Sequence, residues 1–370
     1  EVAERLCPRL GFTPAETETV AWLVRHHLLM AATAFKRDLA DFKTILDFTS
    51  VVQSPERLRL LLALSVVDIR AVGPGVWNGW KRQLLTDLFD AAEEVLRLGH
   101  KQRGRDARIA ERKDAVAARL QLPDAEFAQL ARRMPDSFWI AEPVDVAAGN
   151  LKMIHAGAGD GLVIEAGFDR DRDATLVSVH AVDHAGLFFR IAGGIHLAGG
   201  NIIDARIHTT RDGLAIDNFL VQDPLGRPFA EASQIERLRT GIADSLANRN
   251  KLIDRLAAKP LARARAEAFR IEPSALIDNK ASNRFTVIEV NAQDRPALLN
   301  QLAYALFQSK VMLHSAHVAT YGERAVDIFY ITDLLGGKIE SKTRLKAIEK
   351  RLIDAASGIA DSEAHARDAA

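Results

Sequence analysis

The chain has a single cysteine, Cys7, among its 370 residues. One cysteine excludes an internal disulfide and a metal cage built from thiolates, and it fits a reducing compartment, for which the cytoplasm is the simplest expectation. Long apolar runs are scarce as well. The run at residues 60–67 lies between charged residues and is well short of the ~20 residues that cross a membrane. We therefore predict no membrane-spanning segment.

The chain also lacks an excess of charge of either sign, because lysine plus arginine and aspartate plus glutamate number 49 each. No overall field would draw it onto nucleic acid or an anionic membrane, so small molecules and proteins are the expected partners. With 48% hydrophobic and 26% charged residues, it has the composition of two or three packed domains. It begins on Glu1 without the apolar segment of a signal peptide, and we expect it to be part of a longer protein.

What the second half does contain is an internal repeat. Two pairs of segments match, 177–187 with 288–298 and 208–219 with 318–329. The first pair alternates apolar and polar residues and ends in Asp-x-x-small-Leu, and the second pair aligns Asp217 with Asp327. Two tandem copies of a small module indicate a sensor or interaction region before they indicate a catalytic one.

The composition divides the chain into five parts. The first shows helical periodicity, and the second contains a strongly charged stretch, residues 100–122. We predict that this stretch is an exposed connecting helix rather than a nucleic-acid patch, while residues 123–150 give no clear pattern. The predicted domains are an all-helical unit at 1–98, a connecting helix and linker at 99–160, a first repeat at 161–260, a second repeat at 283–358 and a tail at 359–370.

Each repeat fits the order strand, helix, strand, strand, helix, strand. In the first copy we expect strands at 175–182, 201–209 and 215–221 and helices at 187–198 and 232–257. In the second copy we expect strands at 285–291, 312–320 and 325–332 and helices at 297–309 and 341–356. The predicted fold class is therefore multidomain, α and α+β, with an all-helical unit followed by two tandem ferredoxin-like βαββαβ domains. Such a sheet leaves its other face or its edges available for pairing.

The corner between the first strand and the first helix, residues 183–187, is a candidate ligand site. Gly186 allows a ligand to approach the backbone, and the unpaired amides at a helix start attract a carboxylate. Asp183 could hold an ammonium group, so one corner could bind both charges of a free amino acid. The alternative is that Asp183 only caps the helix and Gly186 only eases packing. In the second copy Ala297 takes the place of the glycine.

The Asp-x-x-Gly-Leu corner, the turn at residues 199–202 and the βαββαβ order resemble the ACT domain family, the amino-acid-sensing modules of metabolic regulators. In that family the corner loop and the start of the second strand form the effector site, often where two modules meet edge to edge. The resemblance implies effector-binding residues Asp183, His184, Ala185, Gly186, Leu187, Asn201 and Ile202 in the first copy, and Asp294, Arg295, Pro296, Ala297 and Leu298 in the second. Val311 and Met312 stand where the second copy would need the Asn-Ile pair.

The helical part is similar to one enzyme family. The likeness is carried by residues 23–30, 36–41, 67–74 and 77–81. With the two ACT modules, these segments resemble the bifunctional uridylyltransferase/uridylyl-removing enzymes of the bacterial PII nitrogen-signalling system, over nearly the whole chain. The resemblance implies an enzyme that attaches UMP from UTP to PII when glutamine is scarce and removes it in an HD-type domain when glutamine is abundant. It also implies Mg²⁺ or Mn²⁺ in the intact enzyme and glutamine as the allosteric effector.

Parts of that enzyme are missing from the sequence. No Gly-Ser motif with paired aspartates for magnesium and UTP occurs, and the first histidine and the His-Asp doublet of the HD site are absent. The resemblance implies that His27 and Asp68 are what remains of the catalytic and metal-binding set, with His26, Arg37 and Asp38 supporting them or facing the phosphate. Two ligands of a larger set would bind a metal weakly.

Without the resemblance, His27 and Asp68 would be ordinary surface and cap residues. Arg37 and Asp38 would then pair on a helix surface. We interpret the chain as the C-terminal portion of such an enzyme, inactive alone, with PII, glutamine and, in the intact enzyme, UTP and UMP as partners, and with possible self-association through its ACT domains. The alternative is a non-enzymatic amino-acid-sensing regulator that acts through ACT dimerisation.

Overall fold

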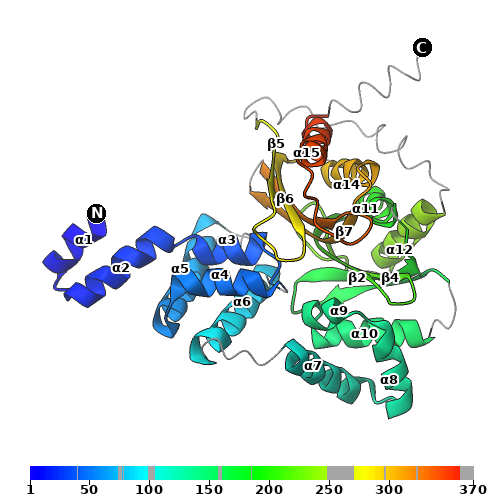
Figure 1. Ribbon diagram of the computed structural model, residues 1–370, viewed down its shortest axis with the longest axis horizontal. Coiled ribbons are helices and arrows are strands. Elements are labelled where there is room, and N and C mark those ends of the chain that lie inside the picture. The colour runs from blue at the N-terminus through cyan, green and yellow to red at the C-terminus, as the bar shows by residue number, and fades with distance from the viewer. Residues whose placement is uncertain are drawn as a thin grey trace. The chain divides into compact units, whose positions relative to one another are not determined.

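The structure is a computed structural model, shown in Figure 1. It describes residues 1–39, 41–73, 77, 79–98, 105–156, 161–184, 186–247, 271–295, 297–321 and 324–358. The chain forms two compact units. Residues 1–105 with 170–173 make up the helical unit, and residues 106–169 with 174–370 make up the sheet unit. No helix in these described ranges is long and apolar enough to cross a membrane.

The helical unit confirms the predicted all-helical character of the first part. It contains α1 (Val2–Leu6), a 3-10 helix η1 (Cys7–Leu10), α2 (Pro14–His26), α3 (Leu29–Lys36), α4 (Phe42–Val52), α5 (Pro55–Val72) and α6 (Gly79–Leu98). Helix starts follow from local chemistry. Thr13 and Glu16 form a reciprocal capping box at α2, and the Ser54 hydroxyl accepts the Arg57 amide at α5. The largest fully buried side chains of this unit are Met30, Phe48, Leu58, Leu61, Leu85 and Leu88.

Four helices of the sheet unit precede its strands: α7 (Arg105–Leu120), α8 (Asp124–Arg133), α9 (Asp136–Ala141) and α10 (Val144–Ala156). The helix predicted in the charged stretch is confirmed as α7, although Ile109 and Val116 are buried against Trp139 and its neighbours. The segment without a clear pattern forms α8 to α10. Each of these helices begins directly after a proline, which cannot occupy the interior of a preceding helix and so sets a boundary.

Eight antiparallel strands form one sheet, in the order β1-β2-β4-β3-β7-β8-β6-β5. Their bounds are β1 (Val163–Asp169), β2 (Ala174–Val182), β3 (Asn201–Thr209), β4 (Leu214–Gln222), β5 (Ser274–Asp278), β6 (Thr286–Gln293), β7 (Met312–Tyr321) and β8 (Arg324–Thr332). The accompanying helices are α11 (Leu187–Leu197), α12 (Ala232–Leu246), α14 (Leu298–Gln308) and α15 (Lys342–Ala356). Each half of the sheet is one copy of the repeat.

The predicted strands and helices of the repeat are confirmed to within a few residues, but their order is not βαββαβ. Each copy has the order ββαββα, because its fourth strand, β1 or β5, comes before the predicted first strand rather than after the second helix. Both are edge strands of their copy, and β5 has only five residues. Neither strand shows a regular alternation of buried and exposed residues. The predicted helical residues 248–257 and the tail at 359–370 lie outside the described residues.

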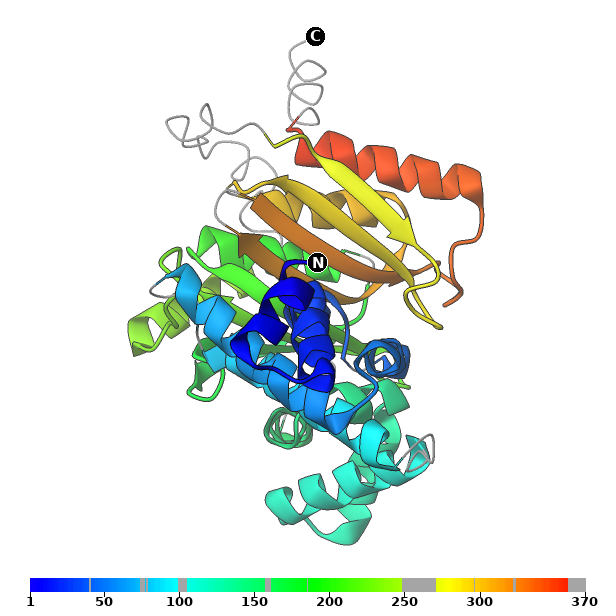
Figure 2. The ribbon, with the colours of Figure 1, turned by 90° about the vertical axis from the view of Figure 1, so that its left-hand side faces the viewer.

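The two copies join edge to edge within the chain. β3 pairs with β7, and Nδ1 of His317 lies 2.8 Å from the carboxylate of Asp204 across this junction. Figure 2 shows the second copy's strands with α15 behind them. The edge available for pairing is therefore used by the chain's own second copy.

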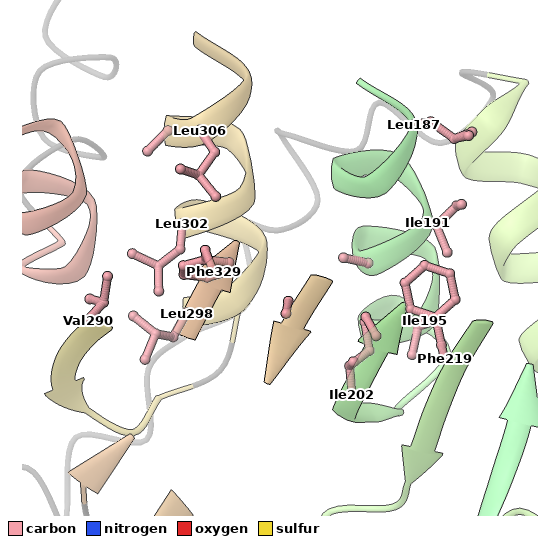
Figure 3. Packing of buried hydrophobic residues seen from close by; sticks show 14 of the residues in the cluster. Leu187, Ile191, Ile195, Ile202, Phe219, Val290, Leu298, Leu302, Leu306 and Phe329 are labelled. Carbon is pink, nitrogen blue, oxygen red and sulfur yellow. The ribbon is translucent and has the colours of Figure 1, made fainter. Parts of the chain in front are cut away.

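One face of the sheet is covered by α11, α12, α14 and α15 (Figure 1), and a single hydrophobic core runs beneath both copies (Figure 3). Gly194 and Gly241 permit α11 and α12 to pack at backbone contact, because a β carbon on Gly194 would lie 2.7 Å from the Gly241 carbonyl oxygen. Helices α9 and α10 contact the first copy through β3 and β2. The corners at residues 183–187 and 294–298 connect the sheet to these covering helices, because they join β2 to α11 and β6 to α14.

Candidate functional site

The first corner, residues 183–187, follows β2 and leads into α11. The Asp183 carboxylate accepts a hydrogen bond from the hydroxyl of Thr209 at the end of β3, with 2.6 Å between the oxygens. The N-cap position of α11 is Gly186, and no side chain caps the helix. The alternative in which Asp183 only caps the helix is therefore wrong. His184 accepts the Gly186 amide at Nδ1, at 3.3 Å, and the Leu187 amide at its carbonyl oxygen, at 2.9 Å, so an anion would bind the next amides of the first turn.

Gly186 faces the second copy of the repeat. A β carbon at this position would lie 3.6 Å from the ring of Phe307 in α14 and 3.7 Å from Nδ1 of His184. The φ angle of Gly186 is −117°, so the backbone does not require glycine here. What the missing side chain provides is space between the first corner and the end of α14.

The second corner, residues 294–298, follows β6 and leads into α14. Its N-cap residue, Ala297, has a φ of 65°, a left-handed conformation that costs an L-residue roughly 1–2 kcal/mol. The Arg295 guanidinium donates to the carbonyl of Ala355 at the end of α15, at 2.6 Å. The two corners thus occupy equivalent positions but differ in backbone conformation and charge.

The leucines that follow the corners are structural anchors. Leu187 and Leu298 are each 4% exposed and lie in the core beneath the sheet's helices (Figure 3). Their burial fixes the first turn of α11 and of α14 over the sheet. Ala185 and Pro296, the remaining predicted corner residues, lie outside the described residues.

The start of β3, with Asn201 and Ile202, is separated from the first corner. Thr209, which holds Asp183, is at the other end of this nine-residue strand, about 26 Å away. Because β3 and β7 are antiparallel, Asn201 lies at the end of the sheet where β7 ends and the second corner begins. Met312, at the start of β7, lies at the end of the first corner. Each corner therefore lies at the same end of the sheet as the start of a strand from the other copy.

Two buried aspartates belong to this region and were aligned by the repeat without being assigned a role. Asp217 on β4 is 1% exposed and Asp327 on β8 is 2% exposed. Within the described residues, Oδ1 of Asp327 has no hydrogen-bond partner, and neither carboxyl oxygen of Asp217 has one of normal geometry, although the backbone amide of His208 partly favours the Asp217 carboxylate. Burial, and then the charge of Asp183, raise the pKa of Asp217 well above its usual range. Burial, and then the charge of Asp294, raise the pKa of Asp327 to about 8. Asp327 therefore favours the neutral acid at pH 7, and the pKa shift of Asp217 has the same direction.

The residues predicted for the hydrolytic site lie in the helical unit. Nδ1 of His27, directly after α2, is 2.9 Å from the carbonyl oxygen of Val24, and Asp68 is exposed on α5. The ring of His26 packs on Trp22, with centroids 4.9 Å apart. Trp22 in turn lines a cavity of about 450 Å³ beside η1 and α2. His27 therefore keeps Nε2 for another partner, whereas His26 takes part in packing.

Arg37 and Asp38 lie past the end of α3. Arg37 has extended backbone angles, φ −129° and ψ 145°, and its amide closes the last turn on Thr33. The alternative of a pair on a helix surface is therefore wrong in its geometry, because neither residue is on a helix. Their proposed role beside a phosphate stays a prediction.

No protein-family model matches the chain. Curated relatives do match it, each described as a bifunctional uridylyltransferase/uridylyl-removing enzyme. The relative from Novosphingobium aromaticivorans is 67% identical over 356 residues, which is 96% of this chain and 39% of the relative. The relative from Erythrobacter litoralis is 57% identical over 365 residues, 98% of this chain and 40% of the relative. The one from Zymomonas mobilis is 50% identical over 368 residues, again 98% and 40%. The chain is homologous to a portion of these enzymes.

The chain spans about 40% of the length of the curated relatives it matches. Within the described residues, no group of three or more His, Cys, Asp or Glu side chains is placed to hold a metal ion. The imidazole of His27 and the carboxylate of Asp68 are ligand types that suit a divalent cation, but such an ion needs more ligands than these two. The described residues therefore do not fit a complete Mg²⁺ or Mn²⁺ site.

Proposed function

We propose that this chain is the C-terminal, glutamine-sensing portion of a cytoplasmic enzyme that uridylylates PII when glutamine is low and removes UMP from PII-UMP when glutamine is high. The homology supports the enzyme family, and the paired corners support the sensor. The observation that carries the sensor is the first corner, where an uncapped helix start and the Asp183 carboxylate lie side by side. Such a pair matches the carboxylate and the ammonium group of a free amino acid.

Sensing requires glutamine to prefer one of two arrangements of the protein. In our proposal the two ACT domains, residues 161–260 and 283–358, supply the difference in glutamine affinity between the two arrangements. The reason is that each corner lies at the same end of the sheet as the start of a strand from the other copy. A ligand in either corner then touches both copies and favours the arrangement in which they are held together. The remaining histidine and aspartate, His27 and Asp68, would act only with the metal ligands and the transferase domain of the intact enzyme.

The proposal is tested first by titrating the 370-residue chain with glutamine in a calorimeter. We expect saturable binding of glutamine, and weaker or no binding of glutamate and alanine. A thermal-shift measurement should show the same order, because a ligand that binds only the folded state raises the melting temperature. Absence of glutamine binding in both measurements would refute the sensor.

Replacing Gly186 with valine should weaken glutamine binding about tenfold, or about 1.4 kcal/mol. The β carbon itself would make ordinary contact with Phe307, but the two γ carbons would fill the space between the first corner and α14. Gly167→Val on the exposed edge strand β1, where nothing lies within 4 Å of an added β carbon, is the matched control. Equal affinity in the Gly186 and Gly167 variants would show that glutamine does not use the first corner.

The chain alone should neither transfer UMP to PII nor release it from PII-UMP, with or without added Mg²⁺ or Mn²⁺. Release should fail because His27 and Asp68 are an incomplete set of ligands, and transfer should fail because the sequence has no Gly-Ser motif with paired aspartates. Mass spectrometry of PII and PII-UMP after incubation measures both reactions directly. Release of UMP by the isolated chain would contradict the assignment of an incomplete site, while leaving the glutamine titration as an independent test of the sensor.

A further inference from the structure

Asp217 and Asp327 are buried, lack hydrogen-bond partners of normal geometry at the atoms named above, and have no part in the function as stated so far. Buried polar groups in folded proteins nearly always find a partner, and an exception calls for a physical reason. The same exception occurs at the same position of both copies. A packing accident in one copy would not explain its recurrence in the other.

The position of Asp217 connects it to the first corner. On the sheet it pairs with Ile207, two residues before Thr209, whose hydroxyl holds Asp183. Side chains two residues apart on a strand share one face, so the Asp183 and Asp217 carboxyl groups both lie on the helix-covered face. Asp217 and Thr209 are diagonal neighbours, whose α carbons lie about 7–8 Å apart. Because the Thr209 hydroxyl holds the Asp183 carboxylate, that carboxylate is drawn toward Asp217, so that one small group could lie between the two side chains.

The second copy repeats the arrangement. Asp327 pairs with Val290, four residues before Asp294 on the same strand and corner, as Asp217 pairs with Val179 four residues before Asp183. In both copies the charge of the corner aspartate reaches the buried carboxyl group. Each corner therefore has two carboxyl groups nearby. One belongs to the corner aspartate, half-buried Asp183 or exposed Asp294, and the other belongs to the buried aspartate beneath the covering helices.

We propose that Asp217 and Asp327 are ligand-binding residues, each of which holds, together with the aspartate of its corner, the ammonium group of a free amino acid. The inference rests on the proposed function, because it names further residues of the same glutamine sites. Two carboxyl groups match a cation, and the uncapped first turn of the helix matches an anion. A zwitterion satisfies both halves, whereas a metal ion would satisfy only the first.

Binding then releases a proton. The neutral carboxylic acid gives its proton to the buffer, and the carboxylate that remains pairs with the ligand's ammonium group, so up to one proton leaves per occupied site. The charged group that acts on Asp217 is Asp183, and the one that acts on Asp327 is Asp294. Asp183 and Arg190 both act on His184 in the first corner. The strand partners of the two buried aspartates are apolar: Val179, Ile207, Val290 and Val318.

Proton release is measured by titrating the unaltered chain with glutamine at pH 7 in phosphate and in Tris, whose heats of ionisation differ. The apparent binding enthalpy should differ between the buffers by the amount expected for up to one proton per glutamine. Identical enthalpies in the two buffers, with glutamine bound in both, would overturn this inference and leave the proposed glutamine sensor standing. No heat of binding in either buffer would overturn both.

The second experiment removes the buried carboxyl groups. The double variant Asp217→Asn/Asp327→Asn should bind glutamine at least tenfold more weakly, yet bind the deamino analogue 4-carbamoylbutanoate as the unaltered chain does. The matched control is Asp223→Asn/Asp333→Asn, which removes two charges from the turns that follow β4 and β8, where these aspartates accept backbone amides. Its glutamine affinity should not change.

Thermal unfolding checks that both double variants are folded. Equal glutamine affinity in the two double variants and the unaltered chain would overturn the inference. If the Asp217→Asn/Asp327→Asn chain fails to fold, the buffer comparison on the unaltered chain still decides the question, because it needs no substitution.

Discussion

Replacing Asp327 with asparagine is expected to stabilise the sheet unit at pH 8.5 by on the order of 3 kcal/mol, or roughly 5–10 °C in melting temperature. The physical reason is the burial of this carboxyl group at 2% exposure, with the charge of Asp294 nearby. The folded state holds Asp327 as the neutral acid, whereas the unfolded chain ionises it freely. Asparagine has nearly the shape of the neutral acid and cannot ionise.

The sign follows from the two pKa values. The pKa of Asp327 is about 8 in the folded state and near 3.8 in the unfolded chain. Between these values the folded state binds more protons, so the stability of the unaltered chain falls as pH rises from about 4 to about 8 and then levels off. The advantage of Asp327→Asn is therefore absent near pH 4, grows through neutral pH and is complete above pH 8.

Urea unfolding from pH 4 to pH 9 measures this difference. Asp333→Asn is the matched control, because the Asp333 carboxylate accepts backbone amides in an exposed turn. Its loss should not produce a difference in free energy of unfolding that grows between pH 4 and pH 9. Parallel stability profiles for Asp327→Asn and the unaltered chain would contradict the prediction. Combined with the binding experiment, a variant that is more stable but binds glutamine less tightly would be typical of a residue kept for ligand binding rather than for folding.

The repeat could be predicted in detail because each element carries its own local pattern. Residues 201–209 and 312–320 alternate and are bounded by turns, and the structure places β3 and β7 within one residue of these limits. The strands β1 and β5 were missed for the opposite reason. They are edge strands with mostly half-exposed residues, so their pairing with β2 and β6 decides their conformation more than their own sequence does.

The sites show the same limit. The corners were recognised because Asp183 and Gly186 are close in sequence and carry a known spacing. Thr209 and Phe307, which border the first corner, are 26 or more residues away and have no local signal. The alignment of Asp217 with Asp327 was visible in the sequence, but only the burial of both side chains reveals that the shared position is unusual. Contacts between distant residues are set by the fold, and a local pattern cannot supply them.

A second polar cluster is also formed by residues that are distant in the sequence. It lies on the face of the sheet opposite the corners. Glu142, 1% exposed at the end of α9, accepts hydrogen bonds from Nε2 of His208 at 2.7 Å and from the Asn218 amide at 3.0 Å. Asn218 exchanges hydrogen bonds with Asn150 on α10. The cluster therefore joins the helices that precede the sheet to two central strands of the first copy. His208 is thus held in this cluster by Glu142.

Replacing Glu142 with alanine should destabilise the sheet unit by about 3–5 kcal/mol at pH 7, because its removal leaves the buried His208 and Asn218 donors without their acceptor and takes a carboxylate away from the half-buried Arg206. Burial alone would raise the pKa of Glu142, but the hydrogen bond from His208 and the charge of Arg206 outweigh it, and the net pKa lies below its usual value. The stabilisation is therefore present above about pH 4.5 and is lost as pH falls through the folded-state pKa.

The matched control for Glu142→Ala is Glu126→Ala on α8, a half-exposed carboxylate 3.7 Å from His155, whose loss should change stability by less than about 1 kcal/mol. Urea unfolding at pH 7 and pH 4 compares the two. The gap in stability between Glu142→Ala and the unaltered chain should narrow at pH 4, since the Glu142 carboxyl of the unfolded chain takes up protons below about pH 4.5 more readily than that of the folded chain, while the Glu126 variant stays close throughout. A Glu142 variant as stable as the control at pH 7 would mean that this cluster does not hold α9 and α10 against the sheet. The first copy would then be free to move relative to these helices without breaking buried contacts, and any signal from its corner would have to leave through β3 and β7.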